Sequence, residues 1–138
     1  MKSKDDSAAA SKRRCQQECN GRCCRYITIV VPAPKRKVDF DELSWFLAHR
    51  NISVYVESRR WHVEAQNPCK YLGSDNLCTV YENRPDVCRD YEIKSCEYPE
   101  RPVHALHFDT RDAFEIWRAE RAAAQQNRRR ARASSPDR

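Results

Sequence analysis

Eight cysteines constrain this chain of 138 residues more than any other feature of its sequence. They fall into two groups of four, and the stretch that contains them runs from residue 15 to residue 96. The first group is Cys15, Cys19, Cys23 and Cys24, and the second is Cys69, Cys78, Cys88 and Cys96. Eight sulfurs are enough for two four-coordinate metal sites or for one larger cluster.

Metal ligation is favoured over two other uses of these thiols. A disulfide framework needs an oxidising compartment, and the polar start of the chain contains no signal peptide. Thiols buried only for packing would be scattered, whereas the first group places four within ten residues. Gaps of three residues, as between Cys15, Cys19 and Cys23, fall within the spacing of zinc ligands. Adjacent Cys23 and Cys24 are expected to serve two sites or two metals of one cluster, and the spacing leaves the pairing open.

Three segments around these cysteines carry a resemblance. They are Cys19-Asn-Gly-Arg-Cys-Cys-Arg25, Cys69-Lys-Tyr-Leu72 and Cys78-Thr-Val-Tyr-Glu-Asn-Arg-Pro-Asp-Val-Cys-Arg-Asp-Tyr91. From Cys15 to Cys96 the chain resembles the YkgJ-type cysteine-cluster family of zinc- or iron-chelating domains. The resemblance implies that all eight cysteines are metal ligands. It also implies a zinc or iron cofactor, the iron held as an ion or in an iron–sulfur cluster, and it implies no reaction.

The net charge of +6 is concentrated in the two ends of the chain. Residues 1–14 carry +3 and residues 118–138 carry +5, while residues 15–117 carry −2. A run of arginines near the end could contact nucleic-acid phosphates without sequence preference, although such runs are more often solvated. Its members are Arg128, Arg129, Arg130 and Arg132. Nucleic acid is therefore a weak partner prediction, and a metal ion is the main one.

Several function classes are excluded or left open. Two glycines, Gly21 and Gly73, cannot supply a phosphate-binding loop or a dinucleotide fingerprint. No apolar run approaches the roughly 18 residues of a membrane span, so we expect a cytoplasmic protein without a membrane partner. No catalytic constellation is identified, and whether the protein is an enzyme stays open.

The predicted fold is a small α+β domain, in which a short antiparallel sheet and helices are joined to a metal-stapled, cysteine-rich turn region. Residues 1–14 are expected to form a disordered basic lead-in, 15–117 the metal-binding domain and 118–138 a basic helical or disordered tail. Strands are predicted at 26–31, 52–56 and 61–65, the last two as a hairpin with a four-residue turn. Helices are predicted from Asp39, as the capping residue, to about Arg50 and from Thr110 to about Arg132.

Other side chains offer second ligands or tuning groups. Arg84 and Arg89 either donate to thiolates or pair with nearby carboxylates. His49 and His62 are expected to be structural, and His104 and His107 would suit a metal only on a helix. A zinc-structured module is the leading interpretation. The alternatives are an iron–sulfur protein that carries electrons or forms part of a redox enzyme, and an accessory nucleic-acid-binding protein.

Overall fold

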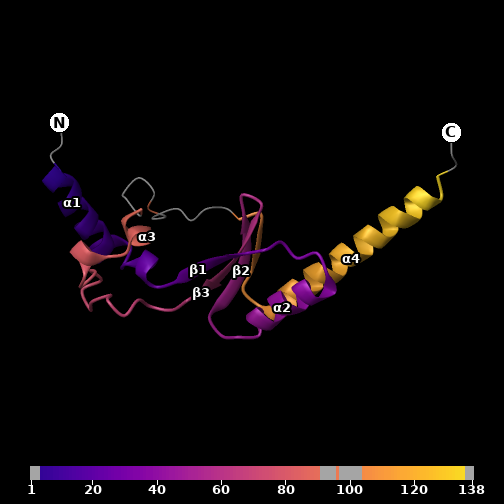
Figure 1. The fold of residues 1–138 in the computed structure, drawn as a ribbon, viewed down its shortest axis with the longest axis horizontal. Coiled ribbons are helices and arrows are strands. Elements are labelled where there is room, and N and C mark those ends of the chain that lie inside the picture. Colours follow the sequence, from indigo (N-terminus) through magenta and orange to yellow (C-terminus); the bar gives the residue numbers. More distant parts are fainter. Residues whose placement is uncertain (1–3, 91–95, 97–103, 136–138) are drawn as a thin grey trace. The chain divides into compact units, whose positions relative to one another are not determined.

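The computed structural model describes residues 4–90, 96 and 104–135 (Figure 1). The chain divides into two compact units. We call Met1–Ile27 with Ala65–Val103 the cysteine unit, and Thr28–Glu64 with His104–Arg138 the sheet unit. The predicted domain limits at residues 15 and 117 stay a prediction, because these two units are interleaved along the chain.

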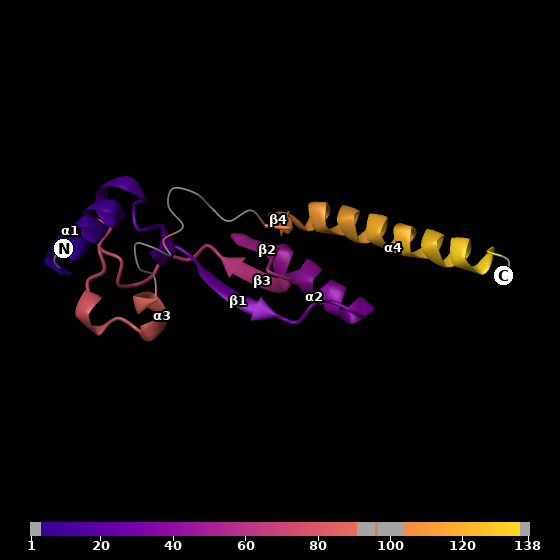
Figure 2. The ribbon, with the colours of Figure 1, turned by 90° about the horizontal axis from the view of Figure 1, so that it is seen from above.

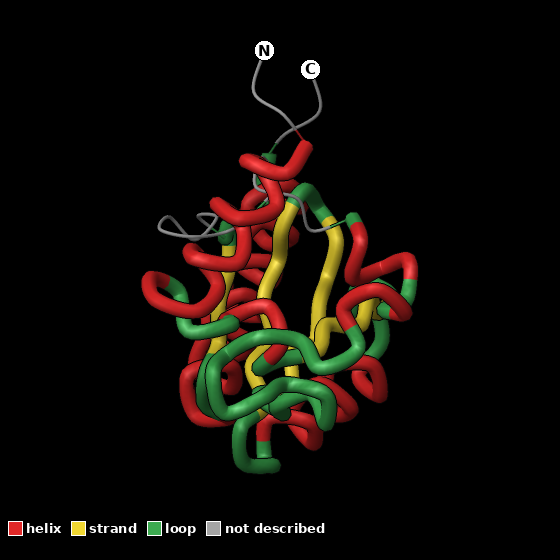
Figure 3. Tube along the Cα trace, turned by 90° about the vertical axis from the view of Figure 1, so that its left-hand side faces the viewer, coloured by secondary structure: helices red, strands yellow, loops and turns green. Residues whose placement is uncertain are grey.

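The sheet unit is built on four antiparallel strands in the order β1-β3-β2-β4. Figure 3 shows the strands in yellow. The strands are β1 (Ile27–Val31), β2 (Ile52–Glu57), β3 (Arg60–Ala65) and β4 (Leu106–Phe108). The predicted α+β class and the three predicted strands are confirmed. The sequence missed β4, whose three residues are too short for an alternating pattern to be visible.

The β2–β3 hairpin is tighter than predicted. Ser58 and Arg59 form a two-residue turn, with φ of 49° and 64°. Two successive residues with positive φ match the right-handed twist of paired strands, as in a type I′ turn. This turn could not be predicted from the sequence, because neither residue is the asparagine or glycine usual in such turns.

The two helices of the sheet unit are α2 (Lys37–Leu47) and α4 (Arg111–Ala133). Asp39 was predicted to cap α2 but is its third residue. Its carboxylate accepts hydrogen bonds from the backbone N–H groups of Arg36, at 2.8 Å, and Lys35, at 3.0 Å. An acid at the third position can reach back in this way, so the capping residue is Arg36 and the helix begins three residues earlier than predicted. The hydroxyl of Thr110 accepts from the N–H of Ala113 at 3.2 Å, so Thr110 caps α4.

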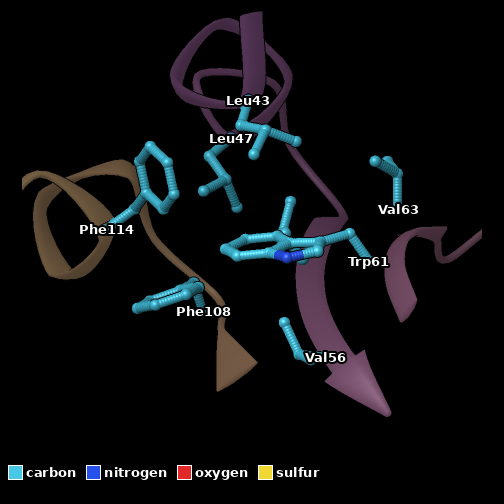
Figure 4. Packing of buried hydrophobic residues seen from close by; sticks show 8 residues of the cluster. Leu43, Leu47, Val56, Trp61, Val63, Phe108 and Phe114 are labelled. Carbon is cyan, nitrogen blue, oxygen red and sulfur yellow. The ribbon is translucent and has the colours of Figure 1, made fainter. Parts of the chain in front are cut away.

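The hydrophobic core lies between the sheet and these helices (Figure 4). Leu43 and Leu47 come from α2, Phe114 from α4, and the strands supply Val54, Val56, Trp61, Val63 and Phe108. Phe114 and Val54 are both 0% exposed. Every member of this cluster belongs to the sheet unit.

The cysteine unit consists of short helical segments joined by turns. They are α1 (Lys4–Arg13), the π-helical turn η1 (Arg14–Glu18), the 3₁₀ turns η2 (Arg22–Cys24) and η3 (Tyr81–Asn83), and α3 (Asp86–Arg89). The lead-in predicted to be disordered is therefore helical from Lys4 to Arg13. Three consecutive alanines favour the helix there, although no apolar periodicity marked it. No helix in the described ranges is long and apolar enough to cross a bilayer.

Candidate metal centre

All eight predicted ligands lie in the cysteine unit, and all eight are free thiols. Cys19 is buried, and Cys15, Cys24, Cys78 and Cys96 are half-buried. Cys23, Cys69 and Cys88 are exposed. The two sequence groups, separated by the strands and helix of the sheet unit, are therefore brought back into one compact unit.

The first group is held by a tight fold of the backbone. The N–H of Gly21 donates to the carbonyl of Cys15 at 2.8 Å, and the N–H of Cys24 donates to the carbonyl of Gly21 at 3.0 Å. Burial raises the pKa of the Cys15 thiol, and the charges of Cys19, Cys96 and Cys24 raise that pKa further. Cys96, remote in sequence, is thus an electrostatic neighbour of the first group.

Two members of the second group, Cys69 and Cys78, lie on a turn that contacts Cys24. The N–H of Cys69 donates to the carbonyl of Cys24 at 2.7 Å, and the N–H of Leu72 donates to the carbonyl of Cys69 at 3.1 Å. Leu72 in turn pairs with Cys78 in an isolated β-bridge. These contacts connect Cys24, Cys69 and Cys78 through the backbone.

Cys88 joins this second set from α3. Burial raises the pKa of the Cys88 thiol, and the negative charges of Cys24, Cys69 and Cys78 raise it further. Cys24, Cys69 and Cys78 are therefore all electrostatic neighbours of Cys88.

Adjacent Cys23 and Cys24 differ in their electrostatics. A hydrogen bond from Cys23 lowers the pKa of Cys24 to about 6, and the positive charges of Arg25 and Arg84 assist. The same hydrogen bond raises the pKa of Cys23 well above its usual value. Cys24 is thus stabilised as a thiolate, the form in which cysteine binds metal.

The two predicted tuning arginines have different roles. The guanidinium of Arg84 lies 3.9 Å from the ring centroid of Tyr81. Its positive charge lowers the pKa of Cys24 and opposes the increase in the pKa of Cys88. Arg89 forms an ion pair with Asp86 at 3.9 Å, in agreement with the second alternative, and donates to the carbonyl oxygens of Glu82, at 3.0 Å, and Arg84, at 3.2 Å. Arg84 is therefore near the sulfurs, whereas Arg89 stabilises the backbone around them.

Sequence reasoning missed a polar link between the two halves of the cysteine unit. Arg25 donates to the carbonyl of Asn20 at 2.8 Å and to the side-chain oxygen of Asn76 at 2.7 Å. Asn76 has φ of 62° and also donates to the carbonyl of Gln16 at 3.4 Å. The turn-forming asparagines were a visible signal, but their partners lie more than fifty residues away in sequence.

The histidines lie in the sheet unit. His62 and His104 stack on Tyr55, with ring centroids 4.8 and 4.0 Å from it. His107 lies in β4, so the helical condition for a His104–His107 metal site is not met. The predicted structural assignment of His49 agrees with its ring nitrogen, which lies 2.9 Å from the carbonyl oxygen of Trp45.

The cysteines fit a metal through the chemistry of their donors. In the ranges that the structure describes, no three or more His, Cys, Asp and Glu side chains are arranged so that they could hold one ion. Thiolates are nevertheless the donors that zinc and iron–sulfur clusters use, and here eight unpaired thiols occupy one small unit.

Comparison with known protein families decides the classification. Residues 14–125 match the model of the CxxCxxCC family, described as a "putative zinc- or iron-chelating domain". The chain belongs to this family. The match covers all eight cysteines and extends into α4. Comparisons with curated proteins and with solved structures gave no match.

Proposed function

We propose that this protein binds zinc through the thiolates of all eight cysteines, in two sets of four. The first set is Cys15, Cys19, Cys23 and Cys96, and the second is Cys24, Cys69, Cys78 and Cys88. The observation that carries this division is the pattern of neighbours around Cys15 and Cys88, together with the backbone link from Cys24 to Cys69. Membership of a metal-chelating family supports the metal itself.

The proposed role of the zinc is structural. Zinc accepts four thiolates without a strong geometric preference, and full cysteine coordination leaves no open position for a substrate. In the described ranges, the cysteine unit contributes no residue to the hydrophobic core cluster. Metal ligation supplies the stability that this unit lacks.

An iron–sulfur protein is the second candidate, because the family description names iron beside zinc. Cys24 is also an electrostatic neighbour of both Cys15 and Cys88. Such a position between the two sets suits a single larger centre that binds all eight thiolates. Purification without oxygen separates the two candidates. Zinc protein is colourless with about two ions per chain, whereas an iron–sulfur cluster gives a brown protein that contains inorganic sulfide.

Single substitutions test whether the adjacent cysteines serve different ions. We expect Cys23→Ser and Cys24→Ser each to retain about one of two zinc ions, because each removes one thiolate from a different set. Thr79→Ser is the matched control and should keep both ions, since its hydroxyl donates to the carbonyl of Tyr71. Loss of nearly all metal from either cysteine variant would indicate one shared centre, and full metal content in both would remove these residues as ligands.

Double substitutions test the proposed sets directly. Cys15→Ser with Cys19→Ser removes two ligands of one set and should leave about one ion. Cys19→Ser with Cys69→Ser removes one ligand from each set and should leave none. Metal content per chain, measured on folded protein, would contradict the division if the two double variants behaved alike.

A further inference from the structure

Helix α4 has an anchored first half in the sheet unit. Phe114 is fully buried, and Arg118 donates to the carboxylate of Asp41 at 2.9 Å. The guanidinium of Arg121 lies 5.4 Å from the ring centroid of Phe40 and 5.5 Å from that of Trp117. These contacts fix the direction of the helix from its first turns to Arg121.

The second half of α4 continues past the end of its partner helix. Arg111 contacts Ser44 and Arg118 contacts Asp41 and Lys37, so α2 runs antiparallel to α4 and begins beside Arg118. Figure 2 shows α4 extending beyond α2. Residues 122–133 are all exposed, and at 1.5 Å per residue they project for roughly 18 Å.

This projecting segment is strongly basic. It contains Arg128, Arg129, Arg130 and Arg132 and no acidic residue. Within the described part of the chain, none of these four guanidinium groups has an ion-pair or hydrogen-bond partner. Four unpaired cations on a regular helix form an intense positive surface.

Two of the four arginines, Arg128 and Arg132, continue a face that the first half of the helix has already oriented. Arg121, Arg128 and Arg132 are separated by seven and four residues, so they lie in one stripe along the helix. Phe114 lies seven residues before Arg121 and shares that stripe. The buried half therefore fixes which way the basic half faces.

The composition of the segment identifies its partner. Its only apolar side chains are alanines, which cannot insert into a lipid interface or fill a hydrophobic groove of a protein. The other side chains are arginine, Gln125, Gln126 and Asn127, all of which donate hydrogen bonds to phosphates and base edges. An α-helix fits the major groove of B-form DNA, whereas the corresponding groove of an RNA duplex is too narrow.

We propose that the projecting half of α4 binds double-stranded DNA, with its arginines on the phosphates that border the major groove. This binding is separate from the metal centre, because the segment contains no cysteine and belongs to the sheet unit. Each arginine that neutralises a phosphate contributes about −0.9 to the slope of log affinity against log salt concentration.

The experiment uses full-length, metal-loaded protein and a fluorescently labelled DNA duplex, with anisotropy measured across a salt series. The test variant replaces all four arginines, Arg128, Arg129, Arg130 and Arg132, by Gln, which keeps the helix propensity. The slope of log affinity against log salt concentration should become shallower, its magnitude falling by about 3 to 4. Affinity at low salt should fall by about 100-fold. The matched control makes the same change in net charge by replacing four exposed basic residues elsewhere with Gln, and it should keep most of the affinity. These residues are Lys35, Arg50, Arg59 and Arg60.

A second variant separates a docked helix from a loose basic tail. Ala124→Pro breaks α4 before the arginines while leaving every charge in place, and circular dichroism verifies the break. We expect it to lose most DNA affinity. Unchanged binding by this variant would overturn the helical mode. Equal effects of the two four-residue variants, or tighter binding to anionic phospholipid vesicles or duplex RNA than to DNA, would overturn the proposal.

Discussion

Gly21 is the residue whose replacement should disturb the cysteine unit most without removing a sulfur. Its φ of 62° lies in the left-handed region, and an added Cβ would lie 3.0 Å from Cδ1 of Leu72 and 3.1 Å from the carbonyl oxygen of Asn76. Both contacts come from the turn that carries Cys69 and Cys78. Gly21 therefore lets the two halves of the unit approach each other.

We predict that Gly21→Ala destabilises the cysteine unit by about 1 to 3 kcal/mol, through the left-handed backbone and the close contacts. Metal should then be released at a lower chelator concentration, which competition with a chromogenic chelator measures. Ser74→Ala, an exposed change on the same turn, is the control and should match the original protein. Equal metal retention by both variants would show that the approach at Gly21 does not support the centre.

At the residue scale, the sequence identified the eight thiols but not the contacts that hold them in place. Cysteine is recognisable anywhere in a chain, so all eight thiols were found. The hydrogen bond from Arg25 to Asn76 joins residues 51 positions apart, and no local pattern encodes such a pairing. The proximity of Cys96 to Cys15 could not be predicted for the same reason, because it depends on how the chain returns in space.

At the scale of elements, Asp41 joins the two helices of the sheet unit. Hydrogen bonds from Lys37 and then from Arg118 lower the pKa of its carboxyl group. A carboxyl whose pKa is lower in the folded state stabilises the fold above its ordinary pKa of about 3.9, and this contribution is lost as the pH falls further.

We therefore predict that Asp41→Asn lowers the melting temperature of the sheet unit near about pH 7, and that the difference from the original protein shrinks toward about pH 3. The melting temperatures are measured by thermal unfolding, with tryptophan fluorescence as the signal. Glu42→Gln is the control, because Glu42 is the exposed next residue of α2 without an ion pair among the described residues. If the melting temperatures of the variant and the original protein differed equally at both pH values, the charge of Asp41 would not contribute to the stability of the sheet unit.

Elements with several turns or a clear alternation were predictable, and short ones were not. The limits of helix α4 agree with the predicted range from Thr110 to about Arg132, although the sequence left helix and disorder open for residues 118–138. The three-residue β4 is defined by its pairing, with Val54 opposite Phe108, and not by its own sequence. The early start of α2 was not predicted, because Asp39 resembles a capping residue although it is the third residue of the helix.

At the scale of the whole molecule, the proposed function predicts that the two units draw their stability from different sources. The sheet unit contains the hydrophobic core cluster, and the cysteine unit contains all eight thiols. Phe114→Ala should cost about 3 to 5 kcal/mol, since it removes a fully buried ring. We predict that this variant loses much of its sheet-unit stability in urea but keeps its metal content. The conservative Phe114→Leu should cost less, and release of metal together with unfolding would show that the units are coupled.

Metal removal provides the reciprocal prediction. Structural zinc supplies roughly 10 to 16 kcal/mol in zinc-finger peptides, which exceeds what the short helical segments of the cysteine unit can supply by themselves. A strong chelator under reducing conditions should therefore make residues 15–24 and 66–90 sensitive to protease. The three tryptophans, Trp45, Trp61 and Trp117, all lie in the sheet unit, so their fluorescence should stay unchanged. Protease resistance after verified metal loss would contradict a structural metal, whereas a parallel change in tryptophan fluorescence would show that the metal supports both units.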